Sequence, residues 1–229
     1  YEVGGVPYLE PGAVLRPNFW RAPTDNDFGA GLHRKYAAIR NPELRLTALE
    51  YELKEGIACV RAVYDFPAYA ATLTVDYAIN NVGEITVEQS VAVKGEAADK
   101  SLPRLFRFGM LMAMPGDFDR IDYYGRGPVE NYADRKSSAF LGLYGQTVDE
   151  QPYPYIRPQE TGTKSDLRWW QQSRPGGWGL RITSDAPFSA SALHYSPEAL
   201  SCGDVKEQLH FPEIEPDTCV WLCIDGVQM

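Results

Sequence analysis

The sequence has few positive charges and no long run of hydrophobic residues. Its 229 residues include 22 basic and 31 acidic side chains, which gives a formal net charge of −9. Because no segment is rich in Lys and Arg, the sequence lacks the electrostatic footprint of a protein that binds nucleic acid or an anionic lipid surface. No apolar stretch approaches the roughly 18 residues of a membrane-spanning helix. We therefore expect neither nucleic acid nor membrane as a partner.

Histidines, cysteine motifs and phosphate-binding loops are also scarce. The three histidines have no partner at metal-ligand spacing, and neither a G-x-S-x-G elbow nor a GxGxxG or GxxxxGK[ST] loop occurs. These absences argue against nucleotide, hydride-transfer and α/β-hydrolase chemistry. The cysteines form neither a CxxC pair nor a zinc pattern, so we expect free, mostly buried thiols at Cys59, Cys202, Cys219 and Cys223.

Alternation of apolar and polar residues is the strongest pattern in the chain. Residues 72–79 and 84–93 alternate on either side of the turn-forming segment 80–83, which is typical of a β-hairpin with one solvated face. A second hairpin is predicted from 168–171 and 178–182 around Pro175-Gly176-Gly177. Further strands are predicted at 57–66, 107–114, 119–124, 140–144 and 219–225, and short helices only at 30–39 and 196–200. The pattern predicts an all-β fold, an antiparallel sandwich or barrel.

A first cluster of polar residues follows Phe19-Trp20. It contains Arg21, Asp25, Asn26 and Asp27. Carboxylate and amide oxygens so close together could bind Ca²⁺ or hydrogen-bond a sugar. They could equally satisfy backbone N–H groups in a loop and orient the arginine, which is the interpretation that we favour because the EF-hand spacing is missing.

A second cluster lies in residues 123–135, where glycines, a proline, arginines and carboxylates occur together. Planar bidentate groups beside aromatic rings suit sugar recognition, because a pyranose offers an apolar face and a rim of hydroxyls. The alternative is an irregular loop locked by its own arginine–carboxylate pairs. The candidate residues are Arg126, Glu130, Asn131, Tyr132, Asp134 and Arg135.

A third cluster combines Glu160 with Asp166, Arg168, Trp169 and Trp170. A carboxylate among aromatic residues could serve a glycosidase, but retaining glycosidases need two carboxylates ~5–5.5 Å apart. The sequence supplies no second partner, so a structural carboxylate is the favoured interpretation.

Three strings carry a family resemblance. They are Phe19-Trp20-Arg21-Ala22-Pro23-Thr24-Asp25-Asn26-Asp27, Tyr124-Gly125-Arg126-Gly127-Pro128-x-Glu130-Asn131-Tyr132-x-Asp134-Arg135 and Tyr155-Ile156-Arg157-Pro158-Gln159-Glu160-x-Gly162. Together with the terminal Ile224-Asp225-Gly226-Val227-Gln228-Met229, they resemble the C-terminal small-chain domain, domain 5, of bacterial β-galactosidases of glycoside hydrolase family 2.

The resemblance implies a galactose-mutarotase-like antiparallel β-supersandwich whose catalytic residues lie elsewhere, on a preceding (β/α)₈ barrel. It implies a single β-sandwich domain over residues 1–229, cut from a longer β-galactosidase and lacking a first strand and the C-terminal loop and strands. Expected partners are the barrel and other domains of the parent, a galactoside sugar and further copies in a homo-oligomer. No cofactor is expected in this chain, although the parent could use Mg²⁺ or Na⁺, and its compartment stays open between cytoplasm and periplasm.

The leading hypothesis is therefore a non-catalytic domain that packs on the barrel, shapes the sugar pocket and is inactive alone. On this hypothesis Asn26, Arg126, Glu130 and Trp169 form one polar-aromatic patch that faces the barrel. An alternative is an independent galactoside-binding module that uses Arg126, Glu130, Tyr132 and Trp169. A third is an aldose 1-epimerase (mutarotase), for which His194 and Glu160 are the only acid–base pair that the sequence offers.

Overall fold

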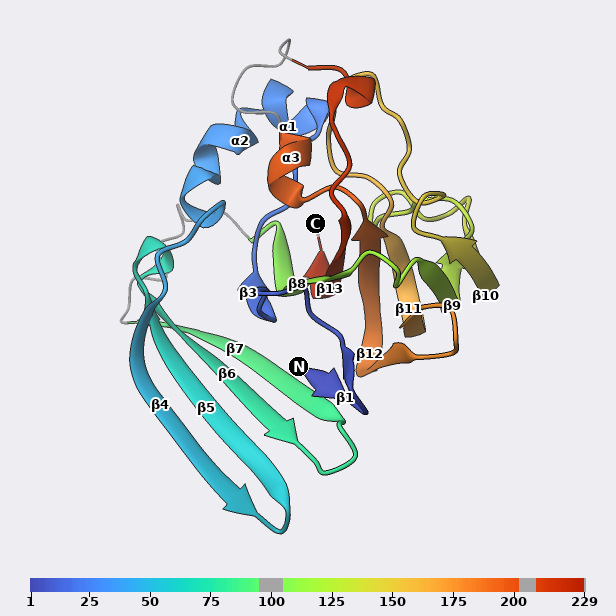
Figure 1. The fold of residues 1–229 in the computed structure, drawn as a ribbon. Coiled ribbons are helices and arrows are strands. Elements are labelled where there is room, and N and C mark those ends of the chain that lie inside the picture. The colour runs from blue at the N-terminus through green and yellow to red at the C-terminus, as the bar shows by residue number, and fades with distance from the viewer. Residues whose placement is uncertain (95–104, 202–208, 229) are drawn as a thin grey trace. The chain divides into compact units, whose positions relative to one another are not determined.

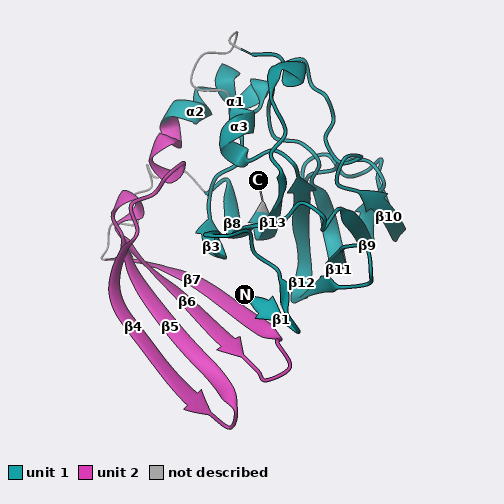
Figure 2. Cartoon of the chain, in the orientation of Figure 1, with its two compact units in different colours: residues 1–34, 105–229 teal, residues 35–104 magenta. Residues whose placement is uncertain are grey.

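The computed structural model describes residues 1–94, 105–201 and 209–228. The chain divides into two compact units, which are Tyr1–Arg34 with Leu105–Met229 (unit 1) and Lys35–Arg104 (unit 2) (Figure 2). Each unit is described by itself below. The expectation of one domain across the whole chain stays a prediction.

Unit 1 is built on a seven-stranded antiparallel sheet in the order β10-β9-β11-β12-β13-β8-β3 (Figure 1). Its strands are β3 (Arg16–Asn18), β8 (Arg107–Pro115), β9 (Arg120–Gly127), β10 (Phe140–Thr147), β11 (Lys164–Ser173), β12 (Gly179–Leu193) and β13 (Cys219–Gln228). β13 lies between β12 and β8, so the last strand of the chain is an interior strand of the sheet. Long loops, residues 128–139 and 148–163, join β9 to β10 and β10 to β11.

Short elements complete unit 1. A two-stranded pair, β1 (Glu2–Val3) with β2 (Val6–Pro7), stands at the N-terminus. The helices α1 (Asp25–Gly29) and α3 (Pro197–Ser201) and the 3₁₀ turn η3 (Phe211–Glu213) belong to its loops, and α2 (Leu32–Lys35) ends at the boundary with unit 2. Figure 1 shows α1 and α3 beyond the same end of the sheet.

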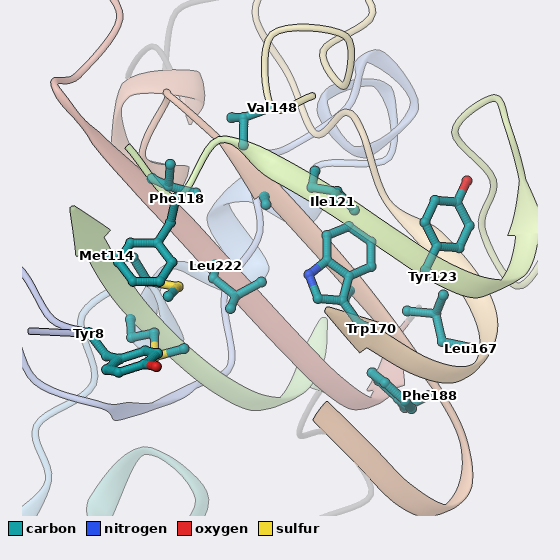
Figure 3. Packing of buried hydrophobic residues seen from close by; sticks show 14 residues of the cluster. Tyr8, Met114, Phe118, Ile121, Tyr123, Val148, Leu167, Trp170, Phe188 and Leu222 are labelled. Atoms are coloured by element: carbon teal, nitrogen blue, oxygen red, sulfur yellow. The ribbon is translucent and has the colours of Figure 1, made fainter. Parts of the chain in front are cut away.

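The core of unit 1 covers one face of the sheet (Figure 3). Alternation puts Ile121 and Tyr123 of β9 inward, beside Leu167 and Trp170 of β11, and all four are fully buried. The Tyr123 and Trp170 rings stack with centroids 5.5 Å apart and an interplanar angle of 19°. Burying side chains of this size contributes roughly 1.5–3 kcal/mol each. A Cβ at Gly125 would lie 2.6 Å from Leu167 Cδ2, so any larger residue there would force the buried Leu167 to shift.

Unit 2 contains a four-stranded antiparallel meander in chain order. The strands are β4 (Arg45–Lys54), β5 (Ile57–Phe66), β6 (Ala71–Ile79) and β7 (Ile85–Val93), with the 3₁₀ turns η1 (Ala37–Ile39) before β4 and η2 (Pro67–Tyr69) between β5 and β6. The sheet is amphipathic, because Leu73 and Val75 are fully buried while Arg61 and Asp76 pair across the opposite face at 2.7 Å. This is the pattern of a sheet with one solvated face.

The all-β, antiparallel class predicted from alternation is confirmed. β5 matches the predicted bounds, and both predicted hairpins are present as β6–β7 and β11–β12. The short helical turns expected within residues 30–39 are present as α2 and η1. One expectation needs correction, because the acidic segment that we expected in a loop, residues 25–27, begins α1. Within the described residues, no helix is long and apolar enough to cross a membrane.

Candidate functional site

The first polar cluster is a helix cap joined to an ion pair. Thr24 caps α1 reciprocally, since its hydroxyl accepts from Asp27 N at 3.3 Å and its own N–H donates to Asp27 Oδ2 at 2.7 Å. Arg21 holds both oxygens of Asp27, with Nη1–Oδ2 at 2.5 Å and Nη2–Oδ1 at 3.2 Å. Burial alone would raise the pKa of Asp27, but the Arg21 guanidinium and the Thr24 N–H lower it. This geometry favours the interpretation that Asp27 orients the arginine and caps the helix over the interpretation that it binds Ca²⁺. Asp25 and Asn26 are exposed.

A buried arginine stands between two carboxylates that come from distant parts of the chain. Arg107, at the start of β8, donates Nη1 to Asp225 Oδ2 at 2.8 Å and Nη2 to Glu160 Oε1. The three side chains are 2%, 0% and 6% exposed, respectively. A register shift in β13 between Asp225 and Val227 accompanies the inward-facing carboxylate. Burial, opposed by Arg107 and assisted by Glu160, raises the pKa of Asp225 to about 7.

Glu130 is the centre of the second cluster. Its Oε1 accepts from the Tyr155 hydroxyl and from Arg135 Nη2 at 2.7 Å. Its Oε2 accepts from Gly162 N and from the Thr161 hydroxyl, both at 2.9 Å. One carboxylate therefore joins the loop after β9 to both ends of the segment between Tyr155 and Gly162.

Arg126 belongs to a neighbouring ion-pair cluster. Its Nε lies 2.5 Å from Asp166 Oδ2, and Lys136 Nζ lies 3.0 Å from Asp166 Oδ1. Asp166 has a left-handed backbone (φ 52°) at a register irregularity of β11, which Asp tolerates better than most residues. The Arg126 guanidinium holds the pKa of Asp166 below its ordinary value against the effect of desolvation. Asn131 joins the two clusters by donating to Arg126 O at 3.0 Å and accepting from Ser165 N at 3.0 Å.

The remaining predicted residues lie around these clusters. The Tyr132 hydroxyl is buried, and burial followed by the nearby carboxylates of Glu160 and Glu130 raises its pKa well above the ordinary value. Asp134 and Arg168 are exposed, and Arg168 donates to a backbone carbonyl of its own strand. Trp169 is half-buried on the face of β11 opposite Trp170 and carries the Arg181 guanidinium 4.6 Å from its ring centroid.

A hollow of about 650 Å³ lies beside the Glu130 cluster. It extends from α1 to the loop between β10 and β11 and to residues 209–210, and it is lined by Asp25, Tyr153, Pro154, Tyr155, Ile156, Arg157, Gln159, Leu209 and His210. Tyr153 and Tyr155 pack with ring centroids 4.7 Å apart, and the Arg157 guanidinium covers the Phe28 ring at 3.5 Å. Of the expected patch, Arg126 and Glu130 lie in neighbouring ion-pair clusters, Asn26 is exposed on α1, and Trp169 contacts Arg181. A single patch that faces the barrel stays a prediction.

The chemistry available at these positions is limited. A glycosidase needs two carboxylates across an open cleft, about 5–5.5 Å apart for retention or about 6.5–9.5 Å apart for inversion. Asp25 is the one carboxylate among the described residues that line the hollow. The proposed epimerase pair is engaged separately, because His194 Nδ1 lies 2.9 Å from Cys219 O and Glu160 bonds Arg107.

Metal and thiol chemistry find little support in the part of the chain that the structure describes. Over residues 1–94, 105–201 and 209–228, no group of three or more His, Cys, Asp or Glu side chains could hold a metal ion. Cys59 and Cys219 are half-buried free thiols and Cys223 is a buried one, whose pKa burial raises to about 12. Cys202 lies outside the described residues.

Sequence reasoning missed Arg107 and Asp225. A signal existed for both, because Arg107 stands between Phe106 and Phe108, and Asp225 follows the apolar run 219–224. A charge inside a buried strand needs a partner of opposite sign, so the two strands could have been paired on this ground.

Comparisons with known proteins place the chain in a family. The family model described as "Beta galactosidase small chain" matches residues 1–229. The beta-galactosidase of Priestia megaterium is 36% identical over 224 residues, which cover 94% of this chain and 20% of that protein. The beta-galactosidase of Lactobacillus delbrueckii subsp. bulgaricus is 38% identical over 190 residues, 81% of this chain and 18% of that protein. The one from Streptococcus thermophilus is 29% identical over 229 residues, 98% of this chain and 21% of that protein.

The fold is all-β in two compact units, and unit 1 contains the buried and partly buried ion-pair clusters. The chain belongs to the beta-galactosidase small-chain family. It spans about a fifth of the length of the relatives that it matches.

Proposed function

We propose that this chain is a non-catalytic domain of a longer β-galactosidase of glycoside hydrolase family 2, an enzyme that hydrolyses terminal β-D-galactosides such as lactose. In that enzyme the domain packs against the catalytic (β/α)₈ barrel and helps to shape the sugar pocket. The relatives carry the name beta-galactosidase over a length about five times that of the matched segment, which leaves room for a separate catalytic part.

The observation that carries the proposal is the engagement of one carboxylate in each of the three strings. Asp27 is held by Arg21, Glu160 by Arg107, and Glu130 by four donors that include Arg135. A catalytic carboxylate must face its substrate, with its pKa set for proton transfer or its oxygen free to attack. Carboxylates locked between arginines and backbone N–H groups instead fix loop geometry. The strings are therefore best explained as a rigid scaffold for contacts with another domain.

The other expectations for the parent stay part of this proposal. The domain's partners are the barrel, neighbouring domains and, in a homo-oligomer, further copies, and the galactoside is bound by the assembled enzyme. We assign no Mg²⁺ or Na⁺ to Asp25–Asp27, because Arg21 already neutralises the buried carboxylate there.

Complementation in trans tests the proposal. This chain and the remainder of the parent polypeptide are expressed separately and assayed alone and mixed, with a chromogenic β-galactoside as substrate. We expect no hydrolysis from this chain and a gain of hydrolysis, or of thermal stability of the hydrolytic activity, when both parts are mixed. Hydrolysis by this chain alone would contradict the proposal.

The galactoside-binding module remains the alternative function. Its sequence-predicted residues are engaged internally, since Arg126 pairs with Asp166 and Glu130 with Arg135. Calorimetric titration of the chain with galactose and lactose separates the two functions. Saturable binding that Trp169→Ala abolishes would favour the module over the scaffold.

A further inference from the structure

The hollow beside Glu130 has an apolar rim and a polar floor. On the rim Ile156 is 82% exposed, Tyr153 58% and Leu209 39%. On the floor Arg157 and Gln159 are buried. Large apolar side chains that surround a concavity are the usual anchor points of protein–protein contacts.

The loop that forms this rim is held in place before any partner arrives. Tyr153 N donates to the Thr161 hydroxyl at 2.7 Å, Tyr155 N donates to Tyr153 O at 2.8 Å, and Glu130 binds the Tyr155 hydroxyl. Such a loop loses little conformational entropy on binding, and preorganisation of this kind increases affinity. The exposed position of Ile156 is therefore fixed by the loop's own contacts.

The polar groups around the hollow suit a protein partner better than a sugar. A bound pyranose needs several donors and acceptors for its hydroxyls. Here the Tyr155 hydroxyl is bonded to Glu130, the Arg157 guanidinium covers Phe28, and the Gln159 amide donates to Arg157 O at 3.4 Å. The side chains of the rim residues Ile156 and Leu209 carry no hydrogen-bonding groups.

We propose that the hollow, hereafter the rim socket, receives an apolar side chain from another segment of the same longer polypeptide. The relatives extend about four-fifths of their length beyond the matched segment, so such a segment is covalently linked and present at high effective concentration. A volume of about 650 Å³ accommodates a large side chain with its neighbours. The inference rests on the proposed function, because it takes the occupant from the remainder of the parent.

Thiol labelling in the full-length parent tests the rim socket. Ile156→Cys is compared with Val82→Cys, a matched control in the β6–β7 turn of unit 2, where Val82 is 75% exposed. The probe is a maleimide, and the labelling of the unsubstituted protein is subtracted. We expect the thiol at position 156 to react at least about ten-fold more slowly than that at position 82 in the native protein, as for a side chain in a packed interface. The two rates become equal in urea.

Equal rates in the native full-length protein would overturn the inference. Protection at position 156 that fades on dilution, as an oligomer dissociates, would identify a second copy as the occupant and would overturn it as well. Protection at position 156 that appears only with added galactose or lactose would identify a sugar as the occupant and would also overturn the inference. Because both positions are exposed, neither substitution should prevent folding.

Hydrolysis measured on the same preparations separates this inference from the proposed function. If the full-length protein hydrolyses a β-galactoside while the thiol at position 156 is unprotected, only the rim socket fails. If it hydrolyses no β-galactoside, the proposed function fails whatever the labelling shows. As a second readout, Ile156→Lys should shorten the half-life of the hydrolytic activity at elevated temperature by about ten-fold, and Val82→Lys should leave it unchanged.

Discussion

Replacing Arg107 by methionine tests the most deeply buried charge cluster. Methionine keeps most of the side-chain volume and removes the guanidinium that lies between Asp225 and Glu160. Both carboxylates are nearly inaccessible to solvent, at 0% and 6% side-chain exposure, so water cannot replace the lost partner. The substitution therefore leaves two buried carboxyl groups without a counter-charge.

The expected cost follows from that burial. Breaking a buried ion pair by removing one partner costs about 3–5 kcal/mol, since an uncompensated charge remains. With a urea m-value of roughly 2–3 kcal/mol per molar, this lowers the midpoint of unfolding by about 1–2.5 M. The assay is urea unfolding of unit 1 at pH 8, followed by the fluorescence of tryptophans that include the buried Trp170.

Arg120→Met is the matched control in the same sheet. Its pair with Asp122 is 3.8 Å long, and the side chains are 61% and 37% exposed, so we expect a change below about 1 kcal/mol. Adding Glu160→Gln and Asp225→Asn to Arg107→Met should recover most of the loss, because uncharged side chains remove the desolvated charge. An Arg107→Met protein as stable as the control variant would refute the reasoning.

The pH dependence of this loss has a defined sign. The pKa of Asp225 is raised to about 7 in the folded state, so the native protein holds that proton more tightly than the unfolded chain does. The stability that Asp225 contributes is present below its ordinary pKa and is lost as the pH rises through 7. Without Arg107 the carboxyl titrates higher still, so the deficit of Arg107→Met should be smaller at pH 5 than at pH 8.

Three further substitutions extend the account. Burial lowers the pKa of Lys164 to about 8, so the stability it contributes is present above its ordinary pKa and is lost as the pH falls through 8. In urea titrations, the free energy of unfolding of the wild type relative to Lys164→Met should increase by up to about 3 kcal/mol between pH 8 and pH 10.5. A difference between the two proteins that stays constant with pH would contradict this. Glu130→Gln should cost about 1–3 kcal/mol and speed hydrogen exchange of the Gly162 amide, whereas unchanged exchange would show that the carboxylate does not hold the loop. Thr24→Ala should lower the free energy of unfolding by about 1 kcal/mol, because it removes the hydroxyl that caps α1 and bonds Asp27. An unchanged stability in thermal unfolding would refute the role of the cap.

Local patterns predicted much of the fold. β5 and the β6–β7 hairpin follow from alternation and turn residues, and α3 begins where Ser196 caps it, with the Ala199 N–H donating to its hydroxyl at 3.0 Å. α1 was missed, although Thr24 and Asp27 stand at capping-box spacing, because their acidic neighbours suggested a loop. β4 was also not assigned, although Leu49, Tyr51 and Leu53 alternate with glutamates.

The site was less accessible to sequence reasoning for a physical reason. Arg107 meets Glu160 across 53 positions and Asp225 across 118, so their pairing depends on strand order rather than on any local pattern. The three strings did place Glu130 and Arg126 in one region, but they could not show which groups each carboxylate binds. The hollow likewise joins α1 to residues 153–157 and 209–210, which only the folded chain brings together.

Hydrolysis of a chromogenic β-galactoside by this chain and by the full-length parent, at equal molar concentration, tests the central claim most directly. The account predicts hydrolysis by the full-length protein and none above background by this chain, because Asp27, Glu130 and Glu160 are held in internal contacts. Comparable hydrolysis by this chain alone would contradict it and would place the catalytic carboxylates within these 229 residues.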